Sequence, residues 1–212
     1  MVWDPLGTIG RAFWIGGGQW AGKTTVARLL AERHRLIVYR HDYPAAHSHY
    51  DRAAAAQARA GGPITEFDPE WAFVQRTPAQ MADEVIAQFI ERFDWALDDL
   101  RALEGPTAVV AEGWGLRPES VAGIGFADRM VVLAPTDQFR LHQLRTLPRA
   151  AAFGHEVSDP ELAQRNRIER DRLVGEDAVK SAVRHGIPVI EVDGGHDAEE
   201  IADIVAKQFG LS

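Results

Sequence analysis

A glycine-rich stretch near the start of the chain has the residue types and spacing best suited to chemistry. Residues 17–25 fit G-x-x-x-x-G-K-[ST], the pattern of a phosphate-binding P-loop, without a mismatch. We expect its backbone N–H groups to surround an anion at the N-terminus of the following helix. Lys23 is then placed to neutralise the β- and γ-phosphates of a nucleoside triphosphate, and the Thr24 hydroxyl to bind Mg²⁺. The expected nucleotide-binding residues are Gly17, Gly18, Gln19, Trp20, Ala21, Gly22, Lys23, Thr24 and Thr25.

Two carboxylates follow predicted strands elsewhere in the chain. Asp42 comes just after residues 36–40, and Glu112 just after the apolar run 107–111. Because the carboxyl ends of parallel strands meet at one edge of a sheet, both side chains are expected near the P-loop. Glu112 has the position of an acid that orders Mg²⁺ together with Thr24, and Asp42 that of a general base for a hydroxyl acceptor. On the sequence alone the two roles can be exchanged, and Asp42 can instead cap the following turn.

Further residues near these carboxylates are candidates for binding an acceptor. Tyr43 adjoins Asp42, and Trp114 and Arg117 follow Glu112 in the run Glu-Gly-Trp-Gly-Leu-Arg. Arg117 is placed to clamp an anionic group, although an exposed loop arginine fits the pattern equally well. Aromatic residues such as Trp71 and Phe73 can line the same pocket or belong to the core.

Arginines are concentrated between residues 140 and 172, on both sides of a segment rich in alanine, glycine and proline. This pattern predicts a lid, at about residues 145–165, that closes over the nucleotide and excludes water. Arg145, Arg149 and Arg170 are the candidates for contact with the transferring phosphoryl group. The remaining arginines are spaced as i,i+4 ion pairs on a solvated helix.

Hydrophobic periodicity positions these residues on alternating strands and helices. The strands are short, continuously apolar runs separated by helices, which indicates a parallel sheet covered on both faces. We therefore expect an α/β fold, one domain over residues 1–212 and an acceptor-binding helical region at about residues 43–76. One helix begins with Thr77 as N-cap and Gln80 closing a capping box. The predicted strands are 12–15, 36–40, 107–111, 129–134 and 187–192, and the predicted helices are 23–33, 45–60, 77 to before Gly105, 136–146, 161–185 and 198–209.

Composition excludes several other classes of protein. The formal net charge of −8 argues against a general nucleic-acid-binding protein, which needs a basic face. The chain contains no cysteine, so disulfides and thiolate metal sites are excluded. No apolar run approaches the roughly 20 residues of a membrane helix, and residues 1–10 lack the pattern of a signal peptide. We expect a cytoplasmic protein with no membrane partner.

The chain resembles the nucleoside-monophosphate-kinase-like group of P-loop kinases, which includes adenylate, shikimate and gluconate kinases and chloramphenicol phosphotransferases. The resemblance rests on the P-loop at 17–25, the strand and acid at 109–113, the run Asn166–Asp171 and the strand at 187–194. It implies a three-layer α/β/α P-loop NTPase fold, with strand order 2-3-1-4-5, a mobile lid and Asp42 as the acceptor-side base. The Asp-Gly-x-Pro-Arg run of adenylate kinases and the acceptor arginine pattern of shikimate kinases are both missing from this chain.

These patterns together predict a kinase that uses ATP (or GTP) and Mg²⁺ to phosphorylate a hydroxyl of a small metabolite, nucleoside or antibiotic, as a monomer or homodimer. A nucleoside monophosphate kinase is the first alternative. It requires an arginine cluster at the acceptor pocket, for which Arg40, Arg52, Arg76 and Arg117 are available. A non-catalytic nucleotide-binding regulatory module is the second alternative.

Overall fold

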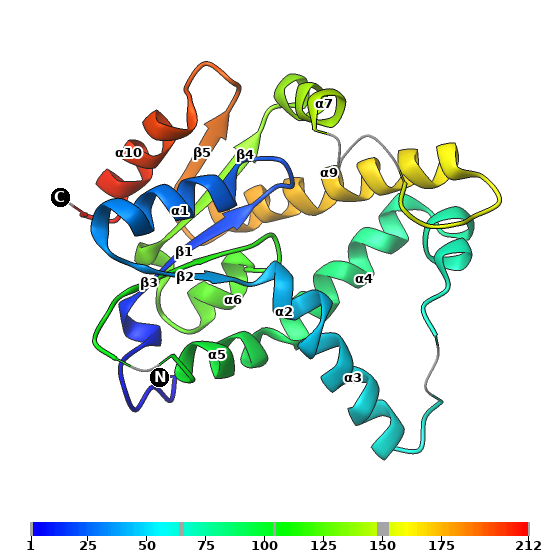
Figure 1. Ribbon diagram of the computed structural model, residues 1–212, viewed down its shortest axis with the longest axis horizontal. Coiled ribbons are helices and arrows are strands. Elements are labelled where there is room, and N and C mark those ends of the chain that lie inside the picture. Colours follow the sequence, from blue (N-terminus) through cyan, green and yellow to red (C-terminus); the bar gives the residue numbers. More distant parts are fainter. Residues whose placement is uncertain (1, 64–65, 104, 148–152, 212) are drawn as a thin grey trace.

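The computed structural model describes residues 2–63, 66–103, 105–147 and 153–211, and it contains a five-stranded sheet (Figure 1). The strand order is β2-β3-β1-β4-β5 and every neighbouring pair is parallel, as the resemblance implied. This topology brings the segments that follow β1, β2 and β3 to one edge of the sheet. The strands are β1 (Ala12–Gly17), β2 (Ile37–Arg40), β3 (Val109–Glu112), β4 (Met130–Pro135) and β5 (Val189–Val192).

The sheet is covered on both faces, which explains its continuously apolar central strands. Every residue of β1 and β3 is buried. On one face, Ile15, Val110 and Val131 pack with α1 (Lys23–His34) and α10 (Ala198–Gln208). On the other face, alternate residues of the same strands pack with three helices, which gives the three layers visible in Figure 1. These three helices are α5 (Phe93–Arg101), α6 (Pro118–Gly123) and α9 (Pro160–Arg184).

The P-loop connects β1 to α1, and its glycines meet specific steric demands. Gly17 has φ +113°, and a Cβ there would collide with the carbonyl of Leu133. Gly22 has φ +79° and precedes α1, which begins without a side-chain cap. The first backbone N–H groups of α1 are therefore available to an anion. Trp20 also has a positive φ, of 67°, a conformation that a bulky residue rarely adopts.

A second group of helices extends away from the sheet (Figure 1). It covers the described part of residues 43–76, where an acceptor-binding region is predicted, and continues into α4. The expected helix 45–60 is divided at His47, and the expected helix from Thr77 is divided at Arg92, where α4 meets α5. The capping box of Thr77 and Gln80 is confirmed. A π-helical turn, η2, was not predicted. The elements of this region are α2 (Asp42–Ala46), α3 (Ser48–Arg59), η2 (Trp71–Gln75) and α4 (Pro78–Glu91).

The remaining elements connect or flank the sheet. The predicted helices 136–146 and 161–185 are confirmed within one residue as α7 (Asp137–Thr146) and α9. Two short 3₁₀ turns, η1 (Ile9–Arg11) and η3 (Ala127–Arg129), precede β1 and β4. Residues 153–159 form neither helix nor strand, as expected for that part of the predicted lid. Within the described ranges, no helix combines the length and apolar character needed to cross a bilayer.

Candidate active site

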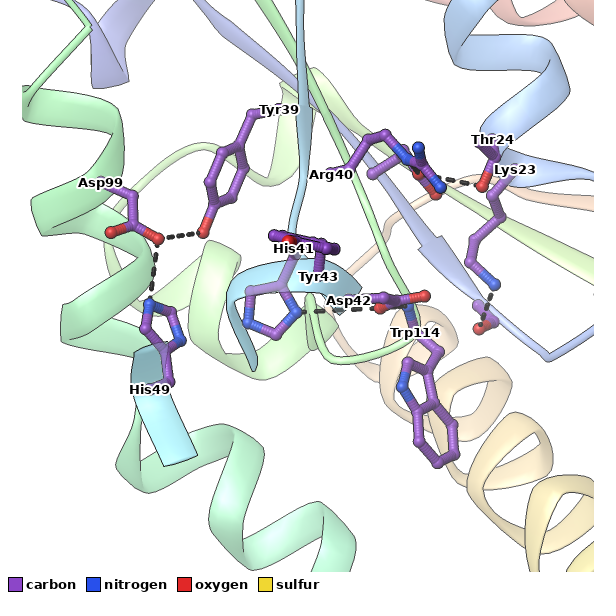
Figure 2. A network of polar contacts seen from close by, with 12 residues as sticks. Lys23, Thr24, Tyr39, Arg40, His41, Asp42, Tyr43, His49, Asp99 and Trp114 are labelled. Carbon is purple, nitrogen blue, oxygen red and sulfur yellow. Dashed lines mark hydrogen bonds and ion pairs between the residues drawn. The ribbon is translucent and has the colours of Figure 1, made fainter. Parts of the chain in front are cut away.

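The P-loop lysine is held inside the loop by backbone carbonyls. Lys23 Nζ donates hydrogen bonds to the carbonyl oxygens of Gly17 at 3.2 Å and Gly18 at 2.7 Å. The side chain is buried, and this burial lowers the Lys23 pKa, while the charges of Asp42, Glu112 and Asp171 oppose that shift. Three carboxylates therefore act on this ammonium group. Figure 2 shows that Lys23 and Asp42 point toward the same space.

Glu112 ends β3 between the two neighbouring strands, in register with Ile15 of β1 and Arg40 of β2. One carboxylate oxygen, Oε1, accepts a hydrogen bond from the Thr24 hydroxyl at 2.9 Å and lies 3.7 Å from Arg40 Nε. The other oxygen, Oε2, is buried and has no hydrogen-bond partner. Burial raises the Glu112 pKa, and the charge of Asp42 raises it further.

The Thr24–Glu112 pair fits a magnesium ion. Mg²⁺ prefers oxygen ligands and is usually bound by one or two protein groups together with phosphates and water. The unpaired Oε2 of Glu112 supplies such a ligand beside the Thr24 hydroxyl. Among the described residues, no group of three or more His, Asp or Glu side chains is arranged to hold a metal ion by itself.

Asp42 begins α2, and the segment after β3 holds its carboxylate in place. Its Oδ1 accepts a hydrogen bond from the backbone N–H of Trp114 at 3.1 Å. A Cβ on Gly113 would lie 2.7 Å from the same oxygen, and one on Gly115 would collide with the His41 ring. The Glu-Gly-Trp-Gly run therefore leaves room for the His-Asp pair that follows β2. The sequence revealed the acid in this run but not the steric role of its glycines.

A buried polar network lies behind Asp42 (Figure 2). His41 is 2% exposed, and its Nδ1 lies 3.9 Å from Asp42 Oδ1 without a hydrogen-bond partner. The His41 and His49 rings lie 6.0 Å apart. His49 Nε2 and the Tyr39 hydroxyl both contact Asp99 Oδ2, at 2.9 and 2.7 Å. The contacts of Asp99 connect β2 and α3 to α5.

A cavity of about 1160 Å³ opens at Asp42, between α2, α3, α4 and residues 66–76. Trp71, Phe73 and Trp114 line it, as the sequence suggested. Tyr43, in contrast, does not line this cavity. The residue is 68% exposed, and its ring stacks on His47. The lining residues are His41, Asp42, Ala45, Ala46, His49, Tyr50, Glu66, Phe67, Asp68, Trp71, Ala72, Phe73, Arg76, Met81, Glu84, Val85, Gln88, Phe89, Arg92, Trp114, His155 and Arg170.

A smaller and more polar cavity, of about 520 Å³, lies beside the P-loop. Gly18 and Gln19 bound it on one side, and α7 and α9 bound it on the other. Among the charged side chains that line it, Arg140 and Asp171 are buried. Trp20 does not line either of these two cavities.

The predicted arginines have different positions. Arg170 lines the large cavity and donates two hydrogen bonds to Asp171 Oδ1. Arg145 is exposed on α7 and lines neither cavity. Arg149 lies outside the described residues. Arg117, expected at the acceptor, is instead fully buried.

The contacts of Arg117 explain its burial. Its guanidinium pairs with Glu119 and Asp177 and donates to the carbonyl of Val174. The residue therefore joins α6 to α9, away from both cavities.

Asp171 is the main site residue that the sequence reading missed. Its i,i+4 spacing from Arg167 indicated an ion pair on a solvated helix. In the structure, however, Asp171 is only 6% exposed, and its charge acts on Lys23. A signal was present in the sequence. Ala163, Val174 and Ala178 are buried at helical spacing from Asp171 and define the inward face of α9.

The described part of the predicted lid contacts the acceptor region. The Ser158 backbone N–H and hydroxyl donate to the Glu70 carboxylate at 2.8 and 2.5 Å. The Phe153 and Phe73 rings lie edge to face, 4.9 Å between centroids. Residues 153–158 thus lie beside η2, at the outer side of the large cavity that His155 lines.

No protein-family model and no curated protein matches this chain. Among solved structures, shikimate kinase from Aquifex aeolicus is 17% identical, with a TM-score of 0.42 and coverage of 94% of this chain and 96% of that one. Shikimate kinase from Acinetobacter baumannii in complex with shikimate is 20% identical, with a TM-score of 0.47 and coverage of 92% and 90%. An uncharacterized protein from Eubacterium ventriosum is 15% identical, with a TM-score of 0.39 and coverage of 95% and 98%. Similarity at this level carries no argument about activity or substrate.

Proposed function

We propose that the protein is a kinase that transfers the γ-phosphoryl group of ATP (or GTP), with Mg²⁺, to a hydroxyl of a small molecule. The observation that carries this proposal is the convergence of Lys23, Glu112 and Asp42 at one sheet edge, beside a cavity large enough for an acceptor. Phosphoryl transfer depends mainly on positioning and electrostatic stabilisation, and these groups supply both.

The bound nucleotide and Mg²⁺ supply the phosphoryl group and its electrophilic character. Lys23 would leave the carbonyls of Gly17 and Gly18 to bind the phosphates, and Thr24 and Glu112 would hold the metal ion. Asp42 accepts the proton of the acceptor hydroxyl while the oxygen of that hydroxyl bonds to the γ-phosphorus. The bond to the β–γ bridging oxygen breaks, and the nucleoside diphosphate leaves.

We assign the base role to Asp42 rather than to Glu112. Asp42 lines the large cavity and its side chain is 42% exposed, whereas Glu112 is 2% exposed and already bonded to Thr24. Arg170 is placed at the acceptor side to stabilise the developing charge. A lid at about residues 145–165, contributions from Arg145 and Arg149, a cytoplasmic location and a monomer or homodimer stay predictions.

The four arginines that the sequence offered for a nucleoside monophosphate acceptor do not gather at the large cavity. Arg40 lies near Glu112, Arg52 pairs with Asp98, and Arg117 is buried elsewhere. Only Arg76 of the four lines the large cavity, and it pairs with Glu84. Arg92 and Arg170 also line this cavity, and Arg170 pairs with Asp171. With two of its three arginines paired to carboxylates, the cavity favours a hydroxyl acceptor over a phosphate acceptor.

The test is release of ADP in the presence of a library of hydroxylated metabolites and antibiotics. We expect Lys23→Ala to lower turnover by roughly 10²-fold or more, because a preorganised charge at the phosphates is lost. Lys207→Ala on α10 is the matched control, since Lys207 is an exposed lysine far from the loop in sequence. Circular dichroism verifies that both variants fold. Full activity of Lys23→Ala would contradict the proposal.

A further inference from the structure

We propose that the acceptor is a bulky alcohol with a planar, uncharged and largely apolar body, which stacks among the aromatic rings of the large cavity while its hydroxyl reaches Asp42. This inference rests on the proposed function and specifies its substrate class. It excludes small polyols, sugar acids and phosphorylated acceptors.

Size is the first argument. Pockets that bury most of a drug-sized ligand usually measure roughly 300–1000 Å³. The cavity at Asp42, at about 1160 Å³, reaches beyond this range. A simple sugar acid would leave most of that space to water, and its hydroxyl would not be fixed against Asp42. A ligand of several rings fills the space and can hold one hydroxyl in place.

The composition of the walls is the second argument. At the inner end, the Phe89 and Trp114 rings lie edge to face, 5.0 Å between centroids. At the outer side, the Phe67 and Phe73 rings lie 6.1 Å apart. Trp71 lines the cavity and is 49% exposed, so a large part of it is open to a ligand. Several aromatic rings in the lining of one cavity favour a planar apolar ligand, because ring pairs add stabilisation beyond simple burial.

Charge is the third argument. Four carboxylates and three arginines line the cavity, so its arginines bring no excess of positive charge. Arg76 pairs with Glu84, and its guanidinium lies 4.1 Å from the Trp71 ring centroid. Arg170 pairs with Asp171 and lies 5.3 Å from the Trp114 ring centroid and 5.5 Å from that of Phe73. These two arginines already have carboxylate partners and lie against rings, which suits an uncharged acceptor body.

A graded series of alcohols tests the inference. Glycerol, benzyl alcohol and 2-naphthalenemethanol each present a primary hydroxyl on a body of increasing aromatic area, and gluconate represents the small acids. Binding is measured by calorimetry without nucleotide, and phosphorylation by ADP release with ATP and Mg²⁺. We expect the Kd to fall about tenfold from benzyl alcohol to 2-naphthalenemethanol, because the second ring adds both buried apolar area and a ring contact. Glycerol and gluconate are expected to bind more weakly than either.

The chain offers a matched pair of tryptophan variants. Trp71 and Trp3 are both exposed and both lie against an arginine, Arg76 and Arg101 respectively, but only Trp71 lines the cavity. We expect Trp71→Leu to weaken 2-naphthalenemethanol binding about tenfold. Trp3→Leu should leave it unchanged. If Trp71→Leu fails to fold, Phe73→Leu on the same wall decides the question.

Failure of this inference differs from failure of the proposed function. If gluconate or glycerol binds and is phosphorylated while the aromatic alcohols do neither, the acceptor class is wrong and the kinase assignment stands. If 2-naphthalenemethanol binds in a Trp71-dependent manner but no member of the series or of the wider library is phosphorylated, the kinase assignment is contradicted and the cavity assignment stands. An unchanged 2-naphthalenemethanol affinity in both Trp71→Leu and Phe73→Leu would overturn the inference.

Discussion

Glu112 illustrates how a buried carboxylate can oppose stability. Its carboxylate is buried, one oxygen has no hydrogen-bond partner, and burial raises its pKa. Loss of hydration therefore disfavours the charged form in the folded protein. Because an acid with a raised pKa binds its proton more readily when folded, its cost to stability grows as the pH rises through the raised pKa. We expect a metal ion beside Thr24 to offset this cost.

The first prediction concerns Glu112→Gln. We expect the ligand-free variant to be more stable than the parent at pH 8, and the difference to shrink as the pH falls toward 5. The midpoint of urea denaturation at the two pH values measures this effect. The stabilisation that Mg-ATP confers, and turnover, should both decrease. A variant less stable than the parent at pH 8 would show that the buried charge is already compensated.

The second prediction concerns the position of Asp42. Asp42→Asn should lower kcat by about 10²–10⁴-fold with little change in the KM for ATP, because it removes proton acceptance and not phosphate binding. Gly113→Ala retains the acid, but its new Cβ would lie 2.7 Å from Asp42 Oδ1. We therefore expect it to lower kcat as well. Gly123→Ala on α6, where a Cβ has open space, is the control. Steady-state kinetics with a responsive acceptor measure all three, and an unchanged kcat in Asp42→Asn would contradict the base assignment.

Sequence reasoning at this scale succeeded where one residue follows a strand or belongs to a motif. Lys23, Asp42 and Glu112 lie near one another as predicted, because parallel topology brings strand ends together; their roles stay predictions. It failed for Arg117 and Asp171, whose positions depend on how α9 packs against α6 and the P-loop. A long-range partner such as Asp177 is not encoded in the local pattern around Arg117.

At the scale of elements, hydrophobic runs and caps predicted every strand and the principal helices. The short elements α6 and η2 were not predicted. The other errors lie where a helix breaks without proline or glycine. The apolar spacing continues from α4 into α5, and only the conformation of Arg92, φ −94° and ψ 5°, separates the two. The break allows α5 to pack on the sheet while α4 borders the large cavity. Such a change of direction is determined by packing on both sides and is not visible in periodicity.

The third prediction concerns the attachment of α3 to α5. His49 is buried and bonded to Asp99 of α5, near Arg52 and His41. Burial is the largest cause of a lowered His49 pKa; Asp99 opposes this shift, and the charges of His41 and Arg52 add to it. A histidine whose pKa is lowered by folding stabilises the folded state at pH values above its pKa in the unfolded chain. This stabilisation is lost as the pH falls from the unfolded-state pKa toward the lower folded-state pKa. We expect His49→Gln to be less stable than the parent at pH 8, by about 1 kcal/mol.

The difference in unfolding free energy between His49→Gln and the parent should become smaller at pH 5. Urea denaturation at both pH values measures it, with His196→Gln as the control because His196 is exposed. A difference that stays constant with pH would mean that His49 contributes only packing and its hydrogen bond. A larger difference at pH 5 would mean that the protonated form pairs with Asp99 and that the lowered pKa is wrong.

At the scale of the whole molecule, α9 connects the two halves of the site. It packs against β1 and β4 of the sheet and against α4 and η2 of the acceptor region. Asp171 on this helix acts electrostatically on Lys23, and the adjoining Arg170 lines the large cavity and pairs with Asp171. The buried carboxylate of Asp171 therefore interacts with both Lys23, where we expect a phosphate, and Arg170, where we expect the acceptor. Binding at the two places should be coupled.

The fourth prediction is the size and origin of this coupling. With 2-naphthalenemethanol as acceptor, we expect a non-hydrolysable ATP analogue with Mg²⁺ to lower the acceptor Kd by about fivefold or more, a common size for coupling between sites. The acceptor should lower the Kd of the analogue by the same factor, as thermodynamic linkage requires. Asp171→Asn should bring the factor close to one, because Arg170 then loses the partner that it shares with Lys23. Glu161→Gln, at the exposed start of α9, should leave the factor unchanged. Calorimetric titration of each ligand with and without the other measures the factor. If Asp171→Asn retains the full coupling, the buried carboxylate of α9 does not carry it, and the proposed connection between the two places is wrong.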